Sequence, residues 1–298
     1  KTRLKKNLKP FFESLNWVEV EKDEKDTTKG YINNPLIYNA INDVFPQYTD
    51  LKNQKLEFWD AADLLCTVQQ LFEETIIENI KPYIYKYNLP IVLGGGAALN
   101  VLCNTRIKNE FKLPVFVPCN ANDSGTAIGG IFAKCKPKEQ VNLSFSNFDL
   151  FDRDELPSYV SNRGGKKTTQ EEIISLIRQG KIIGVVRGRS ECGPRALGNR
   201  SIICDPSFKD MKDILNSKVK HREWYRPFAP MVLQNEASEY FVWDNSDAPF
   251  MSFSAHVRSK YHDKLASITH IDHTARIQTI TEENNPWYFS LLNKMKST

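Results

Sequence analysis

Apolar side chains recur at helical spacing from Asp60 onward. The positions that carry the pattern are Leu64, Leu65, Val68, Leu71, Phe72, Ile76, Ile77 and Ile80. This period predicts one long amphipathic helix, which Asp60 or Asp63 is available to cap and which ends before Pro82. The preceding segment is polar and rich in aromatic residues, and residues 33–50 within it predict short irregular structure.

Two later segments follow one order of patterns, namely a short β-branched strand, a turn rich in Gly and Asn, and a helix-like stretch of Ala, Leu and Ile. They are residues 89–107 and 113–135. Two such units in succession predict an α/β layout. The turns then lie at the C-terminal ends of strands, where open sheets bind ligands.

Residues 137–165 lose this periodicity and gather turn-forming residues, which predicts a domain boundary. Beyond it, Thr169 and Glu172 form a capping-box pattern before a helix that Gly180 closes. The strand pattern KIIGVVRG at residues 181–188 then leads into a segment rich in arginine. We predict two domains, because single cores stop growing near 250–300 residues and this chain has 298.

The composition, with 41% hydrophobic and 26% charged residues, is typical of a soluble globular protein. A net charge of +4 is too small to indicate a nucleic acid partner, and no stretch approaches the roughly 18–20 apolar residues of a membrane span. The six cysteines lie singly among apolar residues, so we expect buried, reduced thiols in a cytoplasmic protein. The chain begins at Lys1 rather than Met, and we expect it to be a piece of a longer polypeptide.

Basic residues concentrate in the arginine-rich segment, interleaved with Gly, Pro and aromatic residues. They are Arg189, Arg195, Arg200, Lys218, Lys220, Arg222 and Arg226. The pair Gly193-Pro194, together with Gly198 and Pro227, fixes the backbone geometry of this segment. Guanidinium groups held on a rigid backbone suit recognition of phosphate or carboxylate groups. We therefore predict a phosphate or acyl-phosphate site here, with a solvated basic face as the alternative.

Two turns carry further candidate chemistry. Gly94, Gly95 and Gly96 follow an apolar strand and precede a helix, where backbone amides and the helix dipole favour a nucleotide. The alternative is a tight turn without a ligand. Asp123 opens the next helix, and the residue pattern alone favours a helix cap over a metal ligand.

A third cluster contains His270, Asp272 and His273. This spacing suits joint metal coordination poorly, so we favour a structural or substrate-orienting role over a metal site. Arg276, close behind, is a candidate fifth cation of the anion site, or else a surface arginine.

Taken together, five motifs in this order and spacing resemble the O-carbamoyltransferases, the family of the nodulation, tobramycin, novobiocin and cephalosporin carbamoyltransferases. They are GGGAALN at 94–100, NDSGTAIGG at 122–130, GPRALGNRS at 193–201, KVKHREWYRPFAP at 218–230 and HTARIQTI at 273–280. The resemblance runs from about Asp60 to the end of the chain.

The resemblance implies an α/β (α+β) fold in two parts. Residues 1–145 would be the C-terminal part of an actin-like (sugar-kinase-like) domain, and residues 155–298 a YrdC-like domain that is incomplete at its C-terminus. The implied reaction converts carbamoyl phosphate and ATP to carbamoyl-adenylate and pyrophosphate. A step assisted by a divalent metal, iron or magnesium, then passes the carbamoyl group to a small-molecule hydroxyl acceptor.

The resemblance also implies roles for particular residues. The residues matching the family's contacts to carbamoyl phosphate and ATP are Arg195, Lys220, Arg222, Arg226 and Arg276, of which Arg195, Lys220 and Arg226 would be catalytic. The residues matching its adenosine-binding turn are Gly94, Gly95, Gly96 and Asn100. Asp123 matches its carboxylate metal ligand, which replaces the helix cap as our expectation.

The chain departs from the family pattern in two places. The family's His-x-x-x-His metal motif is absent, since the five histidines are His221, His256, His262, His270 and His273. An Asn-Thr-Ser-Phe-Asn element that completes the family's phosphate site does not occur before Thr298. Two alternatives remain: a YrdC-like nucleotide- or RNA-binding module related to tRNA threonylcarbamoylation, and a catalytically inactive paralogue.

Overall fold

The computed structural model describes residues 2–14, 35–48, 56–139, 141–146, 152 and 154–297. The chain divides into two compact units, Lys1–Leu89 and Pro90–Thr298. The predicted boundary at 137–165 lies inside the second unit, so the assignment of residues 1–145 and 155–298 to separate domains stays a prediction. Helices and strands are both present, which confirms a mixed α/β protein. The actin-like and YrdC-like assignments stay predictions.

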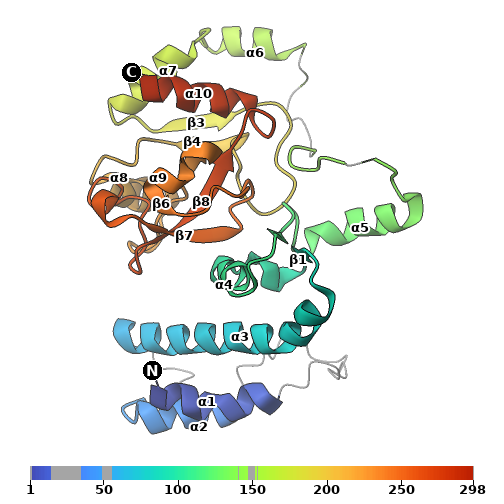
Figure 1. Cartoon of the computed structure of the whole chain (residues 1–298). Coiled ribbons are helices and arrows are strands. Elements are labelled where there is room, and N and C mark those ends of the chain that lie inside the picture. The colour runs from blue at the N-terminus through green and yellow to red at the C-terminus, as the bar shows by residue number, and fades with distance from the viewer. Residues whose placement is uncertain are drawn as a thin grey trace. The chain divides into compact units, whose positions relative to one another are not determined.

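The described part of the first unit contains three helices, α1 (Thr2–Ser14), α2 (Pro35–Val44) and α3 (Phe58–Tyr87) (Figure 1). Their apolar sides meet in one core, formed by Leu4, Leu8, Ala40 and Leu71, with Val44, Phe45, Leu64 and Val68 packed against it. The expectation of irregular structure at 33–50 is therefore wrong for α2. Ala40 and Val44 are four residues apart, a helical spacing that places both on the side facing this core.

The long predicted helix is present as α3, but both of its predicted ends are wrong. The helix begins at Phe58, and Asp60 does not cap it, because its carboxylate accepts hydrogen bonds from Tyr48 and Gln47. It continues through Pro82 to a left-handed residue, Asn88. Proline removes one helical hydrogen bond, but Pro82 is on the exposed side, where water can satisfy the freed carbonyl group.

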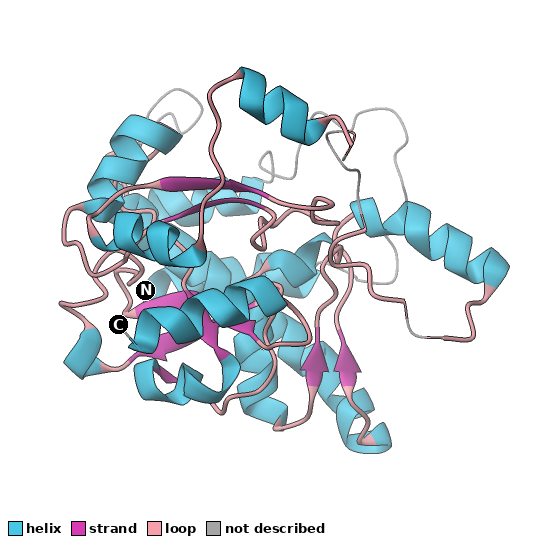
Figure 2. Cartoon of the chain, turned by 90° about the horizontal axis from the view of Figure 1, so that it is seen from above, coloured by secondary structure: helices cyan, strands magenta, loops and turns pink. Residues whose placement is uncertain are grey.

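The second unit begins with the two predicted strand–turn–helix segments. Strand β1 (Ile91–Val92) leads through η2 (Gly96–Leu99) to α4 (Val101–Phe111), and β2 (Val115–Phe116) leads to α5 (Ser124–Cys135). The two strands pair in parallel, as Figure 2 shows. The turns after both strands consequently lie at the same edge of this small sheet, as predicted.

The following elements run from α6 (Leu156–Asn162) through α7 (Gln170–Arg178), β3 (Ile183–Val186) and β4 (Arg200–Ile203) to α8 (Met211–Ile214) and the π-helical segment η3 (Leu215–Lys220). The capping box of Thr169 and Glu172 is present in full at the start of α7. Gly180, with φ +75°, follows the end of this helix as predicted. Strands β3 and β4 pair antiparallel, so the arginine-rich loop between them is the connection of a hairpin.

A four-stranded sheet forms the centre of the second unit, in the order β5 (Met231–Leu233), β8 (Thr274–Ile280), β7 (Phe253–Val257) and β6 (Phe241–Val242). Strand β5 is parallel to β8, and the other pairs are antiparallel. Between these strands lie η4 (Gln234–Glu236), α9 (Ala237–Tyr240) and η5 (Ser259–Tyr261), and α10 (Pro286–Ser297) follows the last strand.

Helices cover this sheet and continue its core. Helix α4 lies on β7, where Thr105 exchanges hydrogen bonds with the backbone of Ser254. Helix α10 packs against α7 and β5 through a second core, formed by Ile174, Ile280, Tyr288 and Leu291. Strand β8 contributes Ala275 and Ile277 to the core of the sheet and Ile280 to this second core, and it also carries Arg276.

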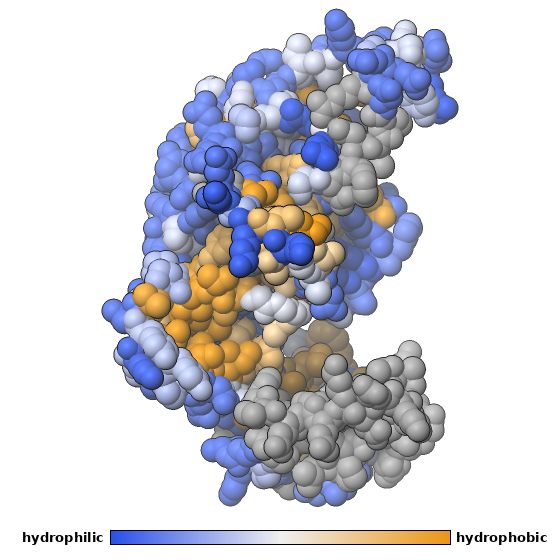
Figure 3. All heavy atoms as spheres, turned by 90° about the vertical axis from the view of Figure 1, so that its right-hand side faces the viewer, coloured by the Kyte–Doolittle hydropathy of each residue, from blue (hydrophilic) through white to orange (hydrophobic). Residues whose placement is uncertain are grey.

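Helix α5 differs from these covered helices, because it has no buried residue although it is largely apolar. Figure 3 shows the face of the molecule that lies on the right in Figure 1, and an extensive hydrophobic surface is visible there. Exposed apolar residues of the second unit include Val92, Phe116 and Ile131. Among the described residues, no helix is both long enough and apolar enough to cross a membrane.

Candidate active site

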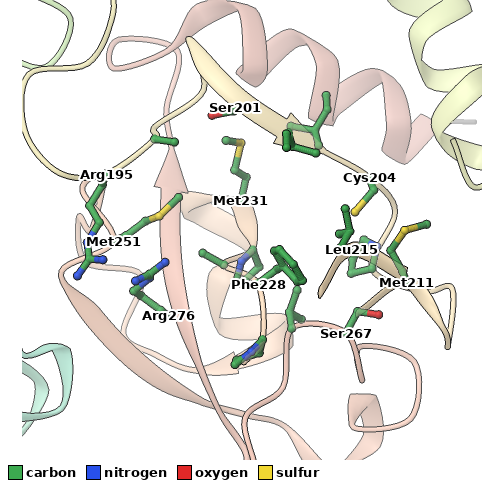
Figure 4. Close-up of a pocket in the computed structure, with 18 of the residues that line it drawn as sticks. Arg195, Ser201, Cys204, Met211, Leu215, Phe228, Met231, Met251, Ser267 and Arg276 are labelled. Atoms are coloured by element: carbon green, nitrogen blue, oxygen red, sulfur yellow. The ribbon is translucent and has the colours of Figure 1, made fainter. Parts of the chain in front are cut away.

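A cavity of about 360 Å³ lies in the second unit between the β3–β4 connection, β4, β8 and α10. One part of its lining is cationic and contains Arg195, Lys220, Arg222 and Arg276. The remainder is mostly apolar and includes Ile203, Met211, Leu215, Met231 and Leu292. Figure 4 shows Arg195 and Arg276 on one side of the pocket and Met211, Leu215 and Cys204 on the other.

Arg276 is the most buried of these cations. Its pKa is lowered to about 10, first by burial and then by the neighbouring positive charges of Arg195, Arg222 and Arg226. Its Nε atom is buried without a hydrogen-bond partner. Cations placed this close repel one another, so the arrangement favours an anion that lies between them.

Arg195 lies on the β3–β4 connection, where burial lowers its pKa. Among the described residues, neither Arg195 nor Arg276 forms an ion pair. Gly193 and Gly198 flank Arg195 with φ of +119° and +126°, conformations that favour glycine. The predicted rigidity of this loop is therefore supported at these two positions.

Arg222 is held at the cavity by a buried asparagine. Its Nε donates to Oδ1 of Asn216 at 2.7 Å, and its guanidinium group lies 4.4 Å from the ring centroid of Phe228. Asn216 is 2% exposed, and its amide nitrogen donates to the carbonyl oxygens of Trp224 and Arg226. This side chain fixes the turn that follows Lys220, the last residue of η3, and that carries Arg222.

Two members of the basic segment have other positions. Arg226 does not line the cavity: its guanidinium group lies 3.4 Å from the carboxylate of Glu223, and its side chain is 54% exposed. Its charge still contributes to lowering the pKa of Arg276. Arg200 donates to the carbonyl oxygens of Arg187, Gly188 and Asn199, so it supports the loop and does not face a ligand.

The histidine cluster has a structural arrangement. Asp272 accepts hydrogen bonds from the backbone amide and the hydroxyl of Thr274, and the ring of His273 stacks on that of His262 at 4.4 Å. Burial lowers the pKa of His270. Among the described residues, no three His, Cys, Asp or Glu side chains form a group that could hold a metal ion.

The glycine turn and Asp123 meet at the edge of the β1–β2 sheet. The backbone amide of Gly95, whose φ is +86°, donates to the carbonyl of Ala121 at 2.6 Å. A Cβ atom at Gly94, Gly95 or Gly96 would meet no atom within 4 Å, so this turn has open space beside it. The binding of adenosine there stays a prediction.

Asn100 and Asp123 open the two helices that follow these turns. Asn100 caps α4, since its Oδ1 accepts from the backbone amide of Cys103. Asp123 precedes α5, but its exposed carboxylate makes no capping hydrogen bond. The structure therefore does not support Asp123 as a side-chain cap of α5, and its role as a metal ligand stays a prediction.

A close backbone contact joins the two candidate sites. A Cβ atom on Gly193 would lie 2.0 Å from the carbonyl oxygen of Cys119, so only glycine permits this approach. Cys119 is buried with Leu197 and Met251, and Cys192 packs against the same core. Cys66 and Cys135 are exposed, so the expectation of six buried thiols is wrong for these two.

Sequence reasoning missed the buried polar residues that hold these loops. Asn216 is one, and Glu191 and Gln278 are others, 7% and 2% exposed. Glu191 was recognisable as the only acidic residue between Arg189 and Arg200. The sequence offers no comparable signal for Asn216 or Gln278, because their partners become neighbours only through the fold.

Fold and site together define an α/β protein with a cationic cavity suited to a phosphorylated small molecule. Two family models match the chain: the carbamoyltransferase N-terminus over residues 19–132 and the carbamoyltransferase C-terminus over residues 174–298. The chain belongs to the carbamoyltransferase family. The five cations lie within the second match, and the glycine turn and Asp123 lie within the first.

Individual relatives align with most of the chain. Nodulation protein NolO of Bradyrhizobium diazoefficiens is 33% identical over 250 residues, which are 78% of this chain and 46% of that protein. Nodulation protein NolNO of Sinorhizobium fredii is 33% identical over 78% of this chain and 37% of its own length. Uncharacterized protein MJ1051 of Methanocaldococcus jannaschii is 29% identical over 94% of this chain and 57% of its own length. The chain thus spans about half the length of these relatives.

Proposed function

We propose that this chain forms part of an ATP-dependent O-carbamoyltransferase that binds carbamoyl phosphate and ATP in the cationic cavity. The observation that carries the proposal is the convergence of Arg195, Arg276, Lys220 and Arg222 on one cavity in a member of this family. Membership argues against the YrdC-like module related to tRNA threonylcarbamoylation, since both matched models are those of carbamoyltransferases. The joint presence of Arg195, Lys220, Arg222 and Arg276 at one cavity argues against an inactive paralogue.

The chemistry of the proposed reaction requires such a cluster. The atoms balance when water cleaves carbamoyl phosphate to carbamate and phosphate, and a carbamate oxygen then displaces pyrophosphate from the α-phosphorus of ATP. Two anions must approach each other in this step, and pyrophosphate leaves with increased negative charge. Fixed guanidinium groups reduce the repulsion and stabilise the leaving group.

The two sides of the cavity suit different parts of these substrates. The guanidinium groups of Arg195 and Arg276 suit phosphate oxygens, to which they can donate in pairs. The apolar wall around Met211 and Leu215 limits access of water, which protects a carbamoyl-adenylate from hydrolysis. Transfer to the acceptor hydroxyl would follow at the turn that carries Asp123.

The proposal includes a divalent metal, iron or magnesium, only if further ligands are supplied from outside the described residues. Asp123 provides one carboxylate, and the described residues contain no second ligand set near it. One carboxylate does not hold such an ion, which takes several ligands. We therefore derive no step through the metal.

Arginine variants with a matched control test the proposal. Titration calorimetry of the folded chain should show binding of carbamoyl phosphate and ATP, each weakened ~10-fold or more by Arg276→Ala, because one charge-assisted contact is worth ~1.5–3 kcal/mol. Arg226→Ala should weaken binding less than Arg276→Ala does, because Arg226 lies outside the cavity lining and would act only through its charge. Arg258→Ala is the control, since Arg258 donates to the carbonyl of Ser238 outside the cavity lining.

Pyrophosphate release measured on the same samples then tests the chemical step. Release that needs both substrates, and that Arg276→Ala removes while Arg258→Ala retains, would support the reaction. Failure of the folded chain to bind either ligand would refute the assignment of the cavity.

A further inference from the structure

Glu191 belongs to the β3–β4 connection that carries Arg195, and its side chain is buried, with the residue 7% exposed. Its Oε1 atom accepts hydrogen bonds from three backbone amides of that loop. The donors are Leu197 at 2.8 Å, Asn199 at 2.8 Å and Arg200 at 3.1 Å. A buried carboxylate that gathers three main-chain donors is a strong local constraint, because hydrogen bonds to a charged acceptor are about twice as strong as neutral ones.

The rest of the loop is fixed by side chains from other elements. Tyr288 of α10 donates to the carbonyl of Gly198 at 3.0 Å, and Gln278 of β8 donates to the carbonyl of Leu197 at 3.0 Å. The amide of Gly198 donates to the hydroxyl of Ser201. In the sequence, Arg195 lies between Glu191 and Leu197, the first residue that donates to Glu191. The hydrogen bond between these two residues closes a ring that contains the backbone of Arg195.

This geometry has a consequence for how an anion is recognised. Successive backbone amides in a loop of this kind commonly bind a phosphate group of a ligand. Here the amides of Leu197, Asn199 and Arg200 are occupied by Glu191 of the same chain. These three amides are therefore not available to a ligand, which leaves side chains such as Arg195 to contact it.

We propose that Glu191 is a positioning residue, which acts as the internal anion of this loop and so holds the guanidinium group of Arg195 toward the cavity. The inference rests on the proposed function in one respect, that Arg195 contacts an anionic substrate. The hydrogen bonds that close the loop around Glu191 do not depend on the ligand. The role of Glu191 in the loop and the contact of Arg195 with a ligand can therefore be tested separately.

Hydrogen exchange of the ligand-free chain tests the loop itself. Glu191→Ala should speed exchange at the amides of Leu197, Asn199 and Arg200 by about tenfold or more, as each loses a bond to a charged acceptor. Glu191→Gln keeps an oxygen acceptor of the same shape and should restore most of the protection. Modification of Arg195 by phenylglyoxal, followed by peptide mapping, should accelerate severalfold in Glu191→Ala and much less in Glu191→Gln.

A matched control separates this effect from general destabilisation. Glu172 also accepts a backbone amide, that of Thr169, but it does so in the capping box of α7. Glu172→Ala should leave both the exchange of the loop amides and the modification of Arg195 unchanged. Unchanged protection of the loop amides in folded Glu191→Ala, or an equal loss in Glu172→Ala, would overturn the proposal.

Calorimetry with carbamoyl phosphate and with ATP then tests the path through Arg195. Glu191→Ala should weaken binding by about tenfold, Glu191→Gln should recover most of it, and the double variant with Arg195→Ala should bind no more weakly than Arg195→Ala alone. Additive losses would show that Glu191 does not act through Arg195 and would overturn the inference. If the unaltered chain binds neither ligand, the proposed function fails, and the exchange and phenylglyoxal results still decide the role of Glu191.

Discussion

Replacement of Gly193 by alanine tests whether the contact between the Arg195 loop and the turn before Asp123 is rigid. The added Cβ would lie 2.0 Å from the carbonyl oxygen of Cys119 and 2.8 Å from its carbonyl carbon. Both atoms belong to the backbone, so no change of side-chain rotamer relieves the clash. Gly193 also has φ +119°, which an alanine adopts only with strain.

The expected magnitude follows from these two causes. A residue held in such a φ region costs about 1–3 kcal/mol, and forcing an extra methyl group into packed structure typically costs another 1–3 kcal/mol. The free energy of unfolding of Gly193→Ala should therefore fall by about 2–6 kcal/mol. At roughly 2–4 °C per kcal/mol, Tm should fall by about 5–20 °C.

Gly184→Ala provides the control. Gly184 lies in β3, where an added Cβ meets no atom within 4 Å and φ is not positive. Its Tm should stay within about 2 °C of the unsubstituted chain, since substitutions without strain or clash stay within about 0.5 kcal/mol. Thermal and urea unfolding of both variants measures the difference. A Tm of Gly193→Ala equal to that of Gly184→Ala would refute the rigid contact.

Two further predictions concern the cavity and the second turn. Burial, followed by the charge of Asp205, raises the pKa of the Cys204 thiol to about 11. Its alkylation by iodoacetamide should therefore keep rising about tenfold per pH unit from pH 8 to 10, where a thiol of ordinary pKa near 8.5 levels off. ATP should slow the reaction, and a plateau below pH 9 in mass spectrometry would contradict the shift. In a full-length protein, Asp123→Ala should abolish carbamoylation of the acceptor but spare pyrophosphate release, and equal loss of both would instead indicate one shared site.

The local part of this fold could be predicted from the sequence. The capping box of Thr169 and Glu172 and the two strand–turn–helix segments depend on neighbouring residues, and the structure confirms them. The ends of α3 could not be predicted from local pattern alone. The carboxylate of Asp60 accepts a hydrogen bond from the hydroxyl of Tyr48, which is a tertiary contact. Pro82 is tolerated because its side of the helix is exposed.

The candidate site could also be predicted only in part. Residue type identified the cations, since Arg195, Lys220 and Arg222 all line one cavity with Arg276, which comes from a distant strand. Residue type could not separate Arg226, which pairs with Glu223 outside the lining. Nor could it identify Asn216, since this residue acts by bonding to carbonyl groups that only the folded turn brings near.

The two turns that carry the predicted chemistry share one backbone junction. The pKa of Cys119 is raised to about 11, first by burial and then by the adjacent thiol of Cys192, which agrees with the close approach at Gly193. Arg195 lies two residues after Gly193, and Asp123 lies four residues after Cys119. Packed backbone does not deform continuously, so a displacement of the Arg195 loop on binding an anion has to be transmitted to the Asp123 turn or be resisted by it. Because no side-chain rotation can absorb the movement at this point, we expect any coupling of adenylate formation to carbamoyl transfer in the proposed reaction to depend on this junction.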